Sequence, residues 1–191
     1  GVVLSLRKTD LARLPSLLTG QLLLVREDKA GRVLDATSVQ LPGVLDDLYA
    51  QAGKLDDLGM TVAPDRTAFH LWAPTAQDVS VCLYDQGDSR ASERLAMQRD
   101  AATGAWSVTL PRDYSGAYYT YLVDVHVGGV GVVRNLVTDP YSISLTTDSK
   151  RSFIGDLSSE TLKPTGWDAD HAPDKVRAAT DMAIYELHVR D

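Results

Sequence analysis

Hydrophobic and polar residues alternate with a period of two through much of the stretch from residue 67 to residue 141. The alternation is clearest at 69–72, 79–84, 106–110 and 118–125. Clusters rich in Gly, Pro, Asp and Ser separate these stretches, which is typical of short strands joined by turns. One face of each strand is therefore predicted to point into a core and the other into solvent. The pattern as a whole favours a mostly β fold, an immunoglobulin-like antiparallel β-sandwich.

The N-terminal part of the chain carries a second strand signal. Residues 21–26 and 32–37 are two strand-like runs joined by a short polar loop that contains Gly31, which predicts a β-hairpin. An isolated hairpin is only marginally stable in water, so its strands need a larger sheet to join. We therefore interpret residues 1–42 as the C-terminal part of a preceding β-domain.

Between this hairpin and the sandwich, the period changes to that of a helix. Val44, Leu45, Leu48 and Tyr49 fall on one helical stripe, which predicts a short amphipathic helix that ends before Gly53. We interpret residues 43–63 as a connector that packs this stripe onto a neighbouring element.

The alternation fades towards the C-terminus. We assign residues 64–145 to the sandwich and residues 146–180, punctuated by Pro164, Gly166 and Pro173, to an ordered linker. Residues 181–191 are again apolar enough to predict a strand, at the end of the chain with no further strand to pair with. Such an unpaired strand should be disordered or should pair with the edge of another chain.

Composition narrows the classes of function. The net charge is −7, and the basic residues are scattered rather than clustered, which argues against nucleic-acid binding. No stretch approaches the ~20 apolar residues of a membrane-spanning helix. The single cysteine, Cys82, cannot form an intramolecular disulfide, and no Cys/His pattern has zinc-site spacing. We predict no metal, no cofactor and no membrane partner, and the compartment, secreted or cytoplasmic, stays open.

Three short sequence motifs indicate the same protein family. They are LPGVLDDLY at 41–49, WAPTA at 72–76 and YELHVRD at 185–191. Together they resemble pullulanase-type debranching enzymes (pullulanase and limit dextrinase) of the α-amylase superfamily of glycoside hydrolases. WAPTA and the later Thr138–Tyr141 resemble the start and end of a family 48 carbohydrate-binding module, which also occurs in branching enzymes and isoamylases.

The resemblance implies a parent protein that hydrolyses α-1,6 links in pullulan, amylopectin or limit dextrins. Its nucleophile and its acid/base carboxylates lie on later strands of a (β/α)₈ barrel, a domain of roughly 250 residues. Residues 181–191 would be the first strand of that barrel, which is otherwise truncated here. We therefore expect no catalytic residue in this chain. The expected partners are α-glucan, glycogen included, and the missing barrel of the same polypeptide.

Tyr84, Tyr118 and Thr120 are the candidate carbohydrate-binding residues, because they lie on strand faces opposite the predicted core. Related glycogen-binding modules use exposed tryptophans and a lysine on the equivalent surface. This chain departs from that pattern, with Thr120 where the lysine would be expected and no tryptophan between Asp85 and Ala105. The module could bind α-glucan directly or serve only as a scaffold for the barrel.

Other residues that suggest chemistry have simpler structural explanations. Trp106 is in phase with Val108 and is predicted to lie in the core, and Trp72 is predicted to pack at the WAPTA corner. Glu186, His188 and Asp191 look like a polar cluster but are expected to build barrel wall.

Two alternative functions remain open. The chain could be a self-standing glucan-binding or regulatory module, or it could be the front module of a glycogen branching enzyme or isoamylase. LPGVLDDLY at 41–49 favours the pullulanase type.

Overall fold

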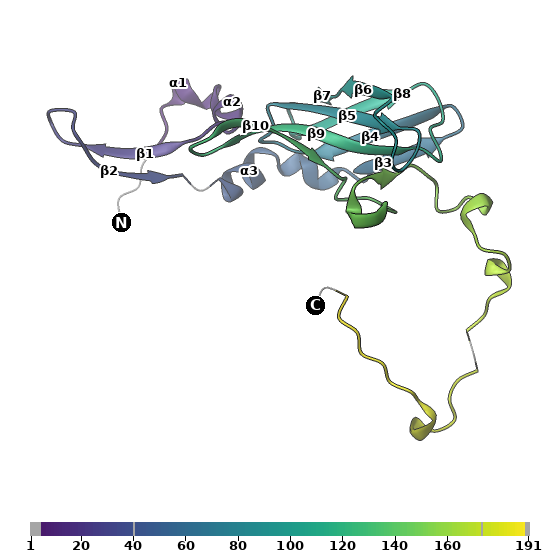
Figure 1. Cartoon of the computed structure of the whole chain (residues 1–191). Helices are drawn as coiled ribbons and strands as arrows, with labels where there is room; N and C mark the ends of the chain where they lie inside the picture. Colours follow the sequence, from purple (N-terminus) through teal and green to yellow (C-terminus); the bar gives the residue numbers. More distant parts are fainter. Residues whose placement is uncertain (1–4, 40, 173, 190–191) are drawn as a thin grey trace. The chain divides into compact units, whose positions relative to one another are not determined.

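The structure is a computed structural model that describes residues 5–39, 41–172 and 174–189. It divides into two units, residues 1–157 and residues 158–191. All of its regular strands lie in the first unit (Figure 1). The helical segments are α1 (Lys8–Leu11), α2 (Leu14–Leu17), α3 (Pro42–Leu48) and the 3-10 turns η1 (Ala50–Lys54), η2 (Thr147–Ser149), η3 (Glu160–Leu162), η4 (Trp167–Ala169) and η5 (Ala179–Asp181). The strands are β1 (Leu23–Glu27), β2 (Val33–Ser38), β3 (Gly59–Ala63), β4 (Arg66–Trp72), β5 (Asp78–Tyr84), β6 (Glu93–Ala96), β7 (Gln98–Arg99), β8 (Ala105–Leu110), β9 (Tyr118–Val127), β10 (Gly131–Val137) and β11 (Ser152–Phe153).

The predicted N-terminal hairpin is confirmed. β1 and β2 pair antiparallel in a separate two-stranded sheet. The loop between them is tied by Asp28, whose Oδ1 accepts hydrogen bonds from the backbone N–H groups of Ala30 and Arg32 at 2.8 and 3.0 Å. Every residue of both strands is exposed. The hairpin therefore has no core of its own, as expected for strands that need a larger sheet.

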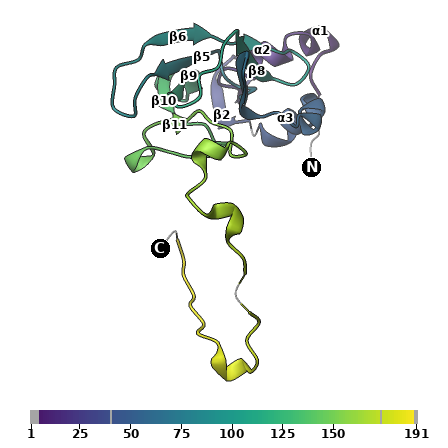
Figure 2. The ribbon, with the colours of Figure 1, turned by 90° about the vertical axis from the view of Figure 1, so that its right-hand side faces the viewer.

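The predicted β-sandwich is confirmed. One sheet has the order β10-β9-β5-β6, with β11 pairing the start of β9, and the other has the order β3-β4-β8-β7. Figure 2 gives a second view of these layers. The four stretches of clearest alternation are β4, β5, β8 and β9. The sandwich is longer than the predicted 64–145, because β3 pairs with β4 and β11 pairs with β9.

The core lies between the two sheets, where every second residue of the central strands points inward. These inward side chains are exposed by 8% or less: Phe69, Leu71, Val79, Val81, Leu83, Trp106, Leu110, Tyr119, Tyr121 and Val123. Phe69 and Tyr119 pack across the sheets with ring centroids 4.9 Å apart. The prediction of a core role for Trp106 is confirmed, and its indole N–H donates to the Ala73 carbonyl at 3.0 Å.

The outer face of β5 departs from the simple pattern. We expected this face to be solvated, but Ser80, Cys82 and Tyr84 are all buried. β5 lies between β6 and β9, so Cys82 has Arg94 and Thr120 as cross-strand neighbours. Tyr84 on the same face is covered by Arg151. Burial raises the pKa of the Cys82 thiol, which disfavours the reactive thiolate.

Asp139 is buried at the end of the same sheet and organises the segment that follows β10. Its Oδ2 accepts hydrogen bonds from the hydroxyls of Tyr119 at 2.7 Å and Tyr121 at 3.0 Å. Its Oδ1 accepts from the backbone N–H of Tyr141 at 2.8 Å, and its own N–H donates to Ser152 Oγ at 3.1 Å. Asp139 therefore closes this end of the sandwich by bonding to β9 through its carboxylate and to Ser152 of β11 through its backbone N–H.

We expect the free energy of unfolding to fall steeply above about pH 10. Burial, reinforced by Asp139, raises the pKa of both Tyr119 and Tyr121. A raised folded-state pKa contributes stability that is complete below the unfolded-state pKa of about 10 and is lost as the pH rises above it. Each such tyrosine removes about 1.4 kcal/mol of stability per pH unit in that range. Urea unfolding between about pH 9 and pH 11 measures the slope. Tyr121→Phe should make it shallower by one proton, and an unchanged slope would contradict this assignment.

The connector is helical as predicted, but it is longer than expected. α3 ends at Leu48, and η1 continues the helical path to Lys54, past the expected end before Gly53. Tyr49 is buried, and its hydroxyl accepts a hydrogen bond from Arg99 of β7 at 2.7 Å. The expectation that this helix packs onto a neighbour therefore holds for Tyr49, while Leu48 is exposed.

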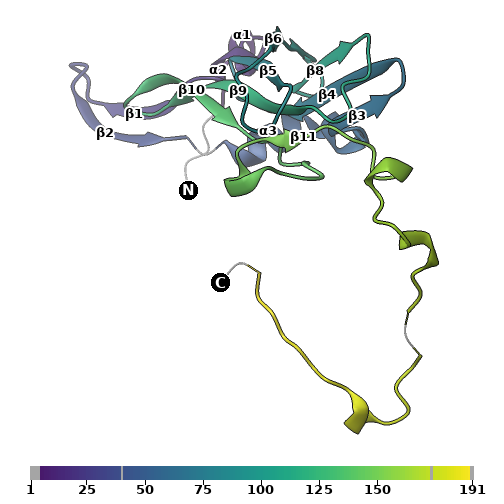
Figure 3. The ribbon, with the colours of Figure 1, turned by 45° about the vertical axis from the view of Figure 1, so that its right-hand side comes forward.

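The second unit is irregular, with short 3-10 turns joined by extended chain (Figure 3). No strand is assigned to the described residues 182–189, so a barrel strand at 181–191 stays a prediction. A strand needs backbone hydrogen bonds from a neighbour, and none is assigned to these residues. Ile184, Tyr185 and Val189 are each exposed by more than four-fifths. Residues 190 and 191, including the candidate Asp191, lie outside the described residues.

Candidate functional site

The structure brings the three predicted carbohydrate-binding residues together. Tyr84 and Tyr118 are directly paired between β5 and β9, and the Tyr84 hydroxyl lies 3.0 Å from Thr120 Oγ1. Their faces are opposite the core, as predicted. Thr120 is exposed by 1% and Tyr84 by 6%, whereas Tyr118 is half-buried. Only Tyr118 therefore offers appreciable surface, and a sugar-binding role for the three residues stays a prediction.

Arg151 is what covers Tyr84. Its guanidinium carbon lies 3.8 Å from the centre of the Tyr84 ring, a cation–π contact. The same guanidinium donates to the backbone carbonyls of Gln86 at 2.6 Å and Ser89 at 2.5 Å. Arg151 therefore holds the loop after β5 against the segment before β11. The sequence pattern gave no signal of this cover, because Arg151 lies 67 positions from Tyr84 in the chain.

Polar pockets flank the covered tyrosines. A pocket of about 730 Å³ is lined by Tyr84 together with Asp88, Asp148 and Lys150, and one of about 510 Å³ is lined by Tyr118 and again Lys150. Side chains of both charges line this surface, and it presents no open aromatic ring from Tyr84. Tyr118 is itself packed edge-on against Phe153, with ring centroids 5.4 Å apart.

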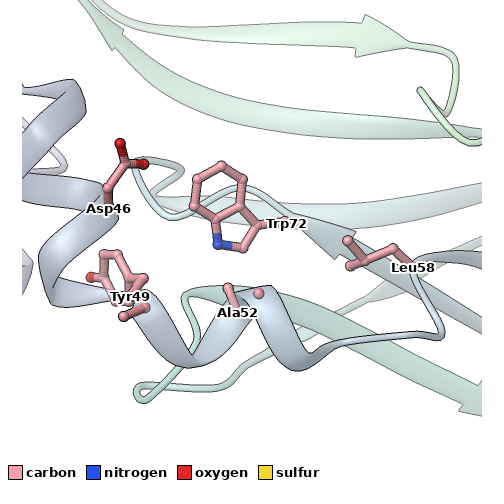
Figure 4. A pocket seen from close by; sticks show the side chains of 7 residues that line it. Asp46, Tyr49, Ala52, Leu58 and Trp72 are labelled. Atoms are coloured by element: carbon pink, nitrogen blue, oxygen red, sulfur yellow. The ribbon is translucent and has the colours of Figure 1, made fainter.

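A different aromatic surface lies at the end of β4. Trp72 is exposed by 38% and lines a pocket of about 360 Å³ with residues of α3 and η1. Figure 4 shows Asp46 and Leu58 at opposite ends of the Trp72 ring, with Tyr49 and Ala52 along the helical segment. The packing role predicted for Trp72 holds in part, since its indole N–H donates to the Thr103 carbonyl at 2.9 Å. Sequence reasoning missed the open part of the ring.

The pocket exists because the residues of η1 beside Trp72 are small. Ala50, Ala52 and Gly53 line it, and a Cβ built on Gly53 would meet no atom within 4 Å. A pocket of this size with an apolar lining and few polar groups is typical of small-ligand sites. The sequence shows the small residues Ala50, Ala52 and Gly53 and a tryptophan at the end of a strand, but it gave no signal that they lie side by side.

The other candidates form no site in the described part of the chain. His188 Nε2 lies 3.6 Å from Glu186 Oε1, but both side chains are largely exposed. His70 forms a 2.8 Å contact with Asp57 near the surface. Within residues 5–39, 41–172 and 174–189, no group of three or more His, Cys, Asp or Glu is arranged to hold a metal ion. No helix among these residues has the length and apolar character needed to cross a membrane.

Comparison with known families matches most of the chain to two of them. Residues 1–47 match the Pullulanase N2 domain. Residues 57–142 match Carbohydrate-binding module 48 (Isoamylase N-terminal domain), a range that contains β3 to β10 and the buried Asp139.

Individual relatives agree with this division. Pullulanase 1, chloroplastic, of Arabidopsis thaliana is 40% identical over 178 residues, which is 92% of this chain and 18% of that protein. The crystal structure of apo pullulanase from Klebsiella pneumoniae aligns with a TM-score of 0.76 at 39% identity, over 84% of this chain and 17% of that one. The K. pneumoniae pullulanase complexed with maltotriose aligns with a TM-score of 0.76 at 38% identity, over 84% and 15%.

This chain spans less than a fifth of the length of the curated relatives that it matches first. The match falls in the N-terminal region of those pullulanases, and it extends on both sides of the sandwich. The chain therefore consists in large part of a Pullulanase N2 domain followed by a carbohydrate-binding module of family 48, and it is similar over most of its length to pullulanases.

Proposed function

We propose that this chain is the non-catalytic front part of a pullulanase-type enzyme that hydrolyses α-1,6 links in pullulan, amylopectin and limit dextrins. One observation carries the proposal. The chain is about 40% identical to pullulanases over nearly its whole length, and it spans less than a fifth of their length. The pair of carboxylates that a retaining glycosidase needs, about 5–5.5 Å apart, would come from a (β/α)₈ barrel elsewhere in the protein.

Within that enzyme, the main role of this part of the protein would be to support the barrel. The β1–β2 hairpin exposes both faces, including Leu23, Leu24 and Val33. Residues 182–189 also expose apolar side chains with no strand partner. Exposed apolar surface of this kind is typical of contacts with further protein, and a first barrel strand is one role that residues 181–191 would take.

Direct α-glucan binding is the second part of the proposal. A carbohydrate-binding module accounts for residues 57–142, and pullulan, amylopectin, glycogen and limit dextrin are the glucans it would meet. Burial of Tyr84 and Thr120 favours the scaffold role at that surface, so a glucan contact would need a different aromatic platform.

Pullulan hydrolysis by the 191-residue chain tests the assignment of the chemistry. We expect no rise in reducing ends above a buffer blank, because this chain would not supply both carboxylates of the mechanism. A matched reaction with a complete pullulanase shows that the assay works. Turnover by this chain that persists after repurification would overturn the proposal.

The reading frame after the codon for Asp191 separates the alternatives. A frame that continues for a barrel of roughly 250 residues or more supports the enzyme. A stop codon there would instead favour a self-standing glucan-binding or regulatory module. A barrel of branching-enzyme or isoamylase type would contradict the pullulanase assignment.

A further inference from the structure

We propose that the Trp72 pocket is an α-glucan subsite that takes one glucose residue, stacked on the exposed face of the indole. This inference rests on the proposed function of the module as a glucan-binding element, and it places the contact away from the Tyr84, Tyr118 and Thr120 surface. It gives the chain a binding site between the connector and the sandwich, where α3 and η1 face the end of β4 (Figure 4).

The indole is held rigidly enough to act as a platform. The Trp72 N–H donates to the Thr103 carbonyl at 2.9 Å. Thr103 is in turn fixed by its hydroxyl, which donates to Asp100 Oδ2 at 2.7 Å. A ring that is already in place before the ligand arrives loses little conformational entropy on binding. Trp72 therefore combines a fixed position with an exposed fraction of 38%.

The pocket has the chemistry of a pyranose site. A glucose ring has an apolar face of C–H groups that suits the indole, and equatorial hydroxyls at its rim that need hydrogen-bond acceptors. Asp46 of α3 is exposed at one end of the Trp72 ring and supplies a carboxylate there. Leu58 at the other end and Ala52 along the side supply apolar contact. Mostly apolar walls with a few polar groups are the usual composition of a ligand pocket.

A cation is the competing ligand, because an aromatic face next to a carboxylate also suits a guanidinium or a quaternary ammonium group. The sugar is favoured because Leu58 and Trp72 of the pocket lie within the range that matches a carbohydrate-binding module. Trp72 is the first residue of the WAPTA stretch at the start of that module. The experiment below includes arginine as a direct comparison.

A titration of the ¹⁵N-labelled 191-residue chain with maltotriose tests the proposal by NMR. The chain has three tryptophans, so each indole N–H reports on a separate place. We expect the Trp72 signal to shift progressively with maltotriose. The signals of Trp106, which is buried, and Trp167, which lies in the other unit, should stay in place.

Two variants change the pocket while keeping the reporter ring. Gly53→Leu fills the open space beside Trp72 without backbone strain, since Gly53 has no positive φ, and should weaken binding about tenfold. Asp46→Asn removes the charged acceptor and should weaken it about threefold. Gly43→Leu is the matched control, because Gly43 also has open space around its Cβ position and does not line the pocket. Its affinity should match that of the unmodified chain.

The outcomes separate this inference from the proposed function. A static Trp72 signal at saturating maltotriose, equal affinity for Gly53→Leu and Gly43→Leu, or a response to arginine in place of maltotriose would each overturn the subsite. None of these results touches the assignment of catalysis, which the pullulan assay tests by itself. A maltotriose response that moves only residues around Tyr118 would keep glucan binding and reject the Trp72 site.

Discussion

Replacing Asp139 with alanine is expected to lower the free energy of unfolding by about 3–5 kcal/mol. The carboxylate is exposed by 3% and accepts both the Tyr119 and the Tyr121 hydroxyl on a single oxygen. Alanine would leave two buried hydroxyl donors and the Tyr141 N–H without their acceptor. Each unsatisfied buried donor costs about 1–3 kcal/mol. Urea unfolding at neutral pH, followed by tryptophan fluorescence, measures the change.

Asp47→Ala is the control for this substitution, because Asp47 is an exposed carboxylate on α3. It should change stability by no more than about 0.5 kcal/mol. A double-mutant cycle tests the mechanism: the cost of Asp139→Asn should be smaller in a Tyr119→Phe, Tyr121→Phe background, since the hydroxyl donors are gone. An Asp139→Ala variant as stable as Asp47→Ala would refute the role assigned to this carboxylate.

Replacing Gly104 with alanine is expected to lower the free energy of unfolding by about 2–5 kcal/mol. Gly104 has a φ of +70°, and a Cβ at this position would lie 2.7 Å from Pro74 Cβ and 3.2 Å from Tyr49 Cδ1. The cost therefore adds a left-handed backbone penalty of about 1–2 kcal/mol to overpacking of about 1–3 kcal/mol. The clash involves backbone-fixed atoms of Pro74, which cannot rotate away.

Gly129→Ala separates the backbone penalty from the cost of the steric clash. Gly129 has a φ of +77°, close to that of Gly104, but nothing lies within 4 Å of its Cβ position. This variant should lose only the stability that corresponds to the backbone penalty, about 1–2 kcal/mol. The difference between the two variants measures the steric term at the Pro74 corner. If both lose the same stability, the close packing of Pro74, Tyr49 and Gly104 contributes nothing.

The Gly104 substitution should also affect the Trp72 pocket. Gly104 follows Thr103, whose carbonyl accepts the Trp72 indole N–H, and its Cβ would press on Tyr49, which lines the same pocket. We therefore expect the Trp72 indole signal to move in Gly104→Ala, while that of Trp106 changes less. Stability and ligand-site geometry are thus coupled through one turn between β7 and β8.

The sequence predicted the strands of the sandwich better than it predicted its candidate site. Alternation reports which residues of one strand share a face, so Trp106 and Tyr119 could be placed inside from local pattern alone. Tyr84 and Thr120 were placed on the correct outer face. Tyr84 is covered by Arg151, which reaches it from a segment with no periodicity. The Tyr84 hydroxyl in turn lies beside Thr120 Oγ1. Local pattern contains no information on such a cover.

Short edge strands and the C-terminal segment also show that local pattern alone does not decide where strands form. β3 and β11 have five and two residues, and pairing with β4 and β9 is what makes them strands. Residues 182–189 have the composition of a strand, yet none is assigned to them. A strand forms only where a neighbouring strand shares its backbone hydrogen bonds. Composition therefore indicates which residues are suited to a strand, not whether the strand forms.

By itself, the amino-acid sequence determined the β-sandwich, its inward-facing residues and the pullulanase-type motifs, because these follow from the period of the chain and from short contiguous stretches. Only the tertiary structure decided that Asp139 unites Tyr119 and Tyr121, that Arg151 covers Tyr84, and that Trp72 keeps an open face beside Gly53. Each of these depends on side chains from segments distant in the chain. Their meeting is set by how the two sheets and the connector pack, which no local periodicity encodes.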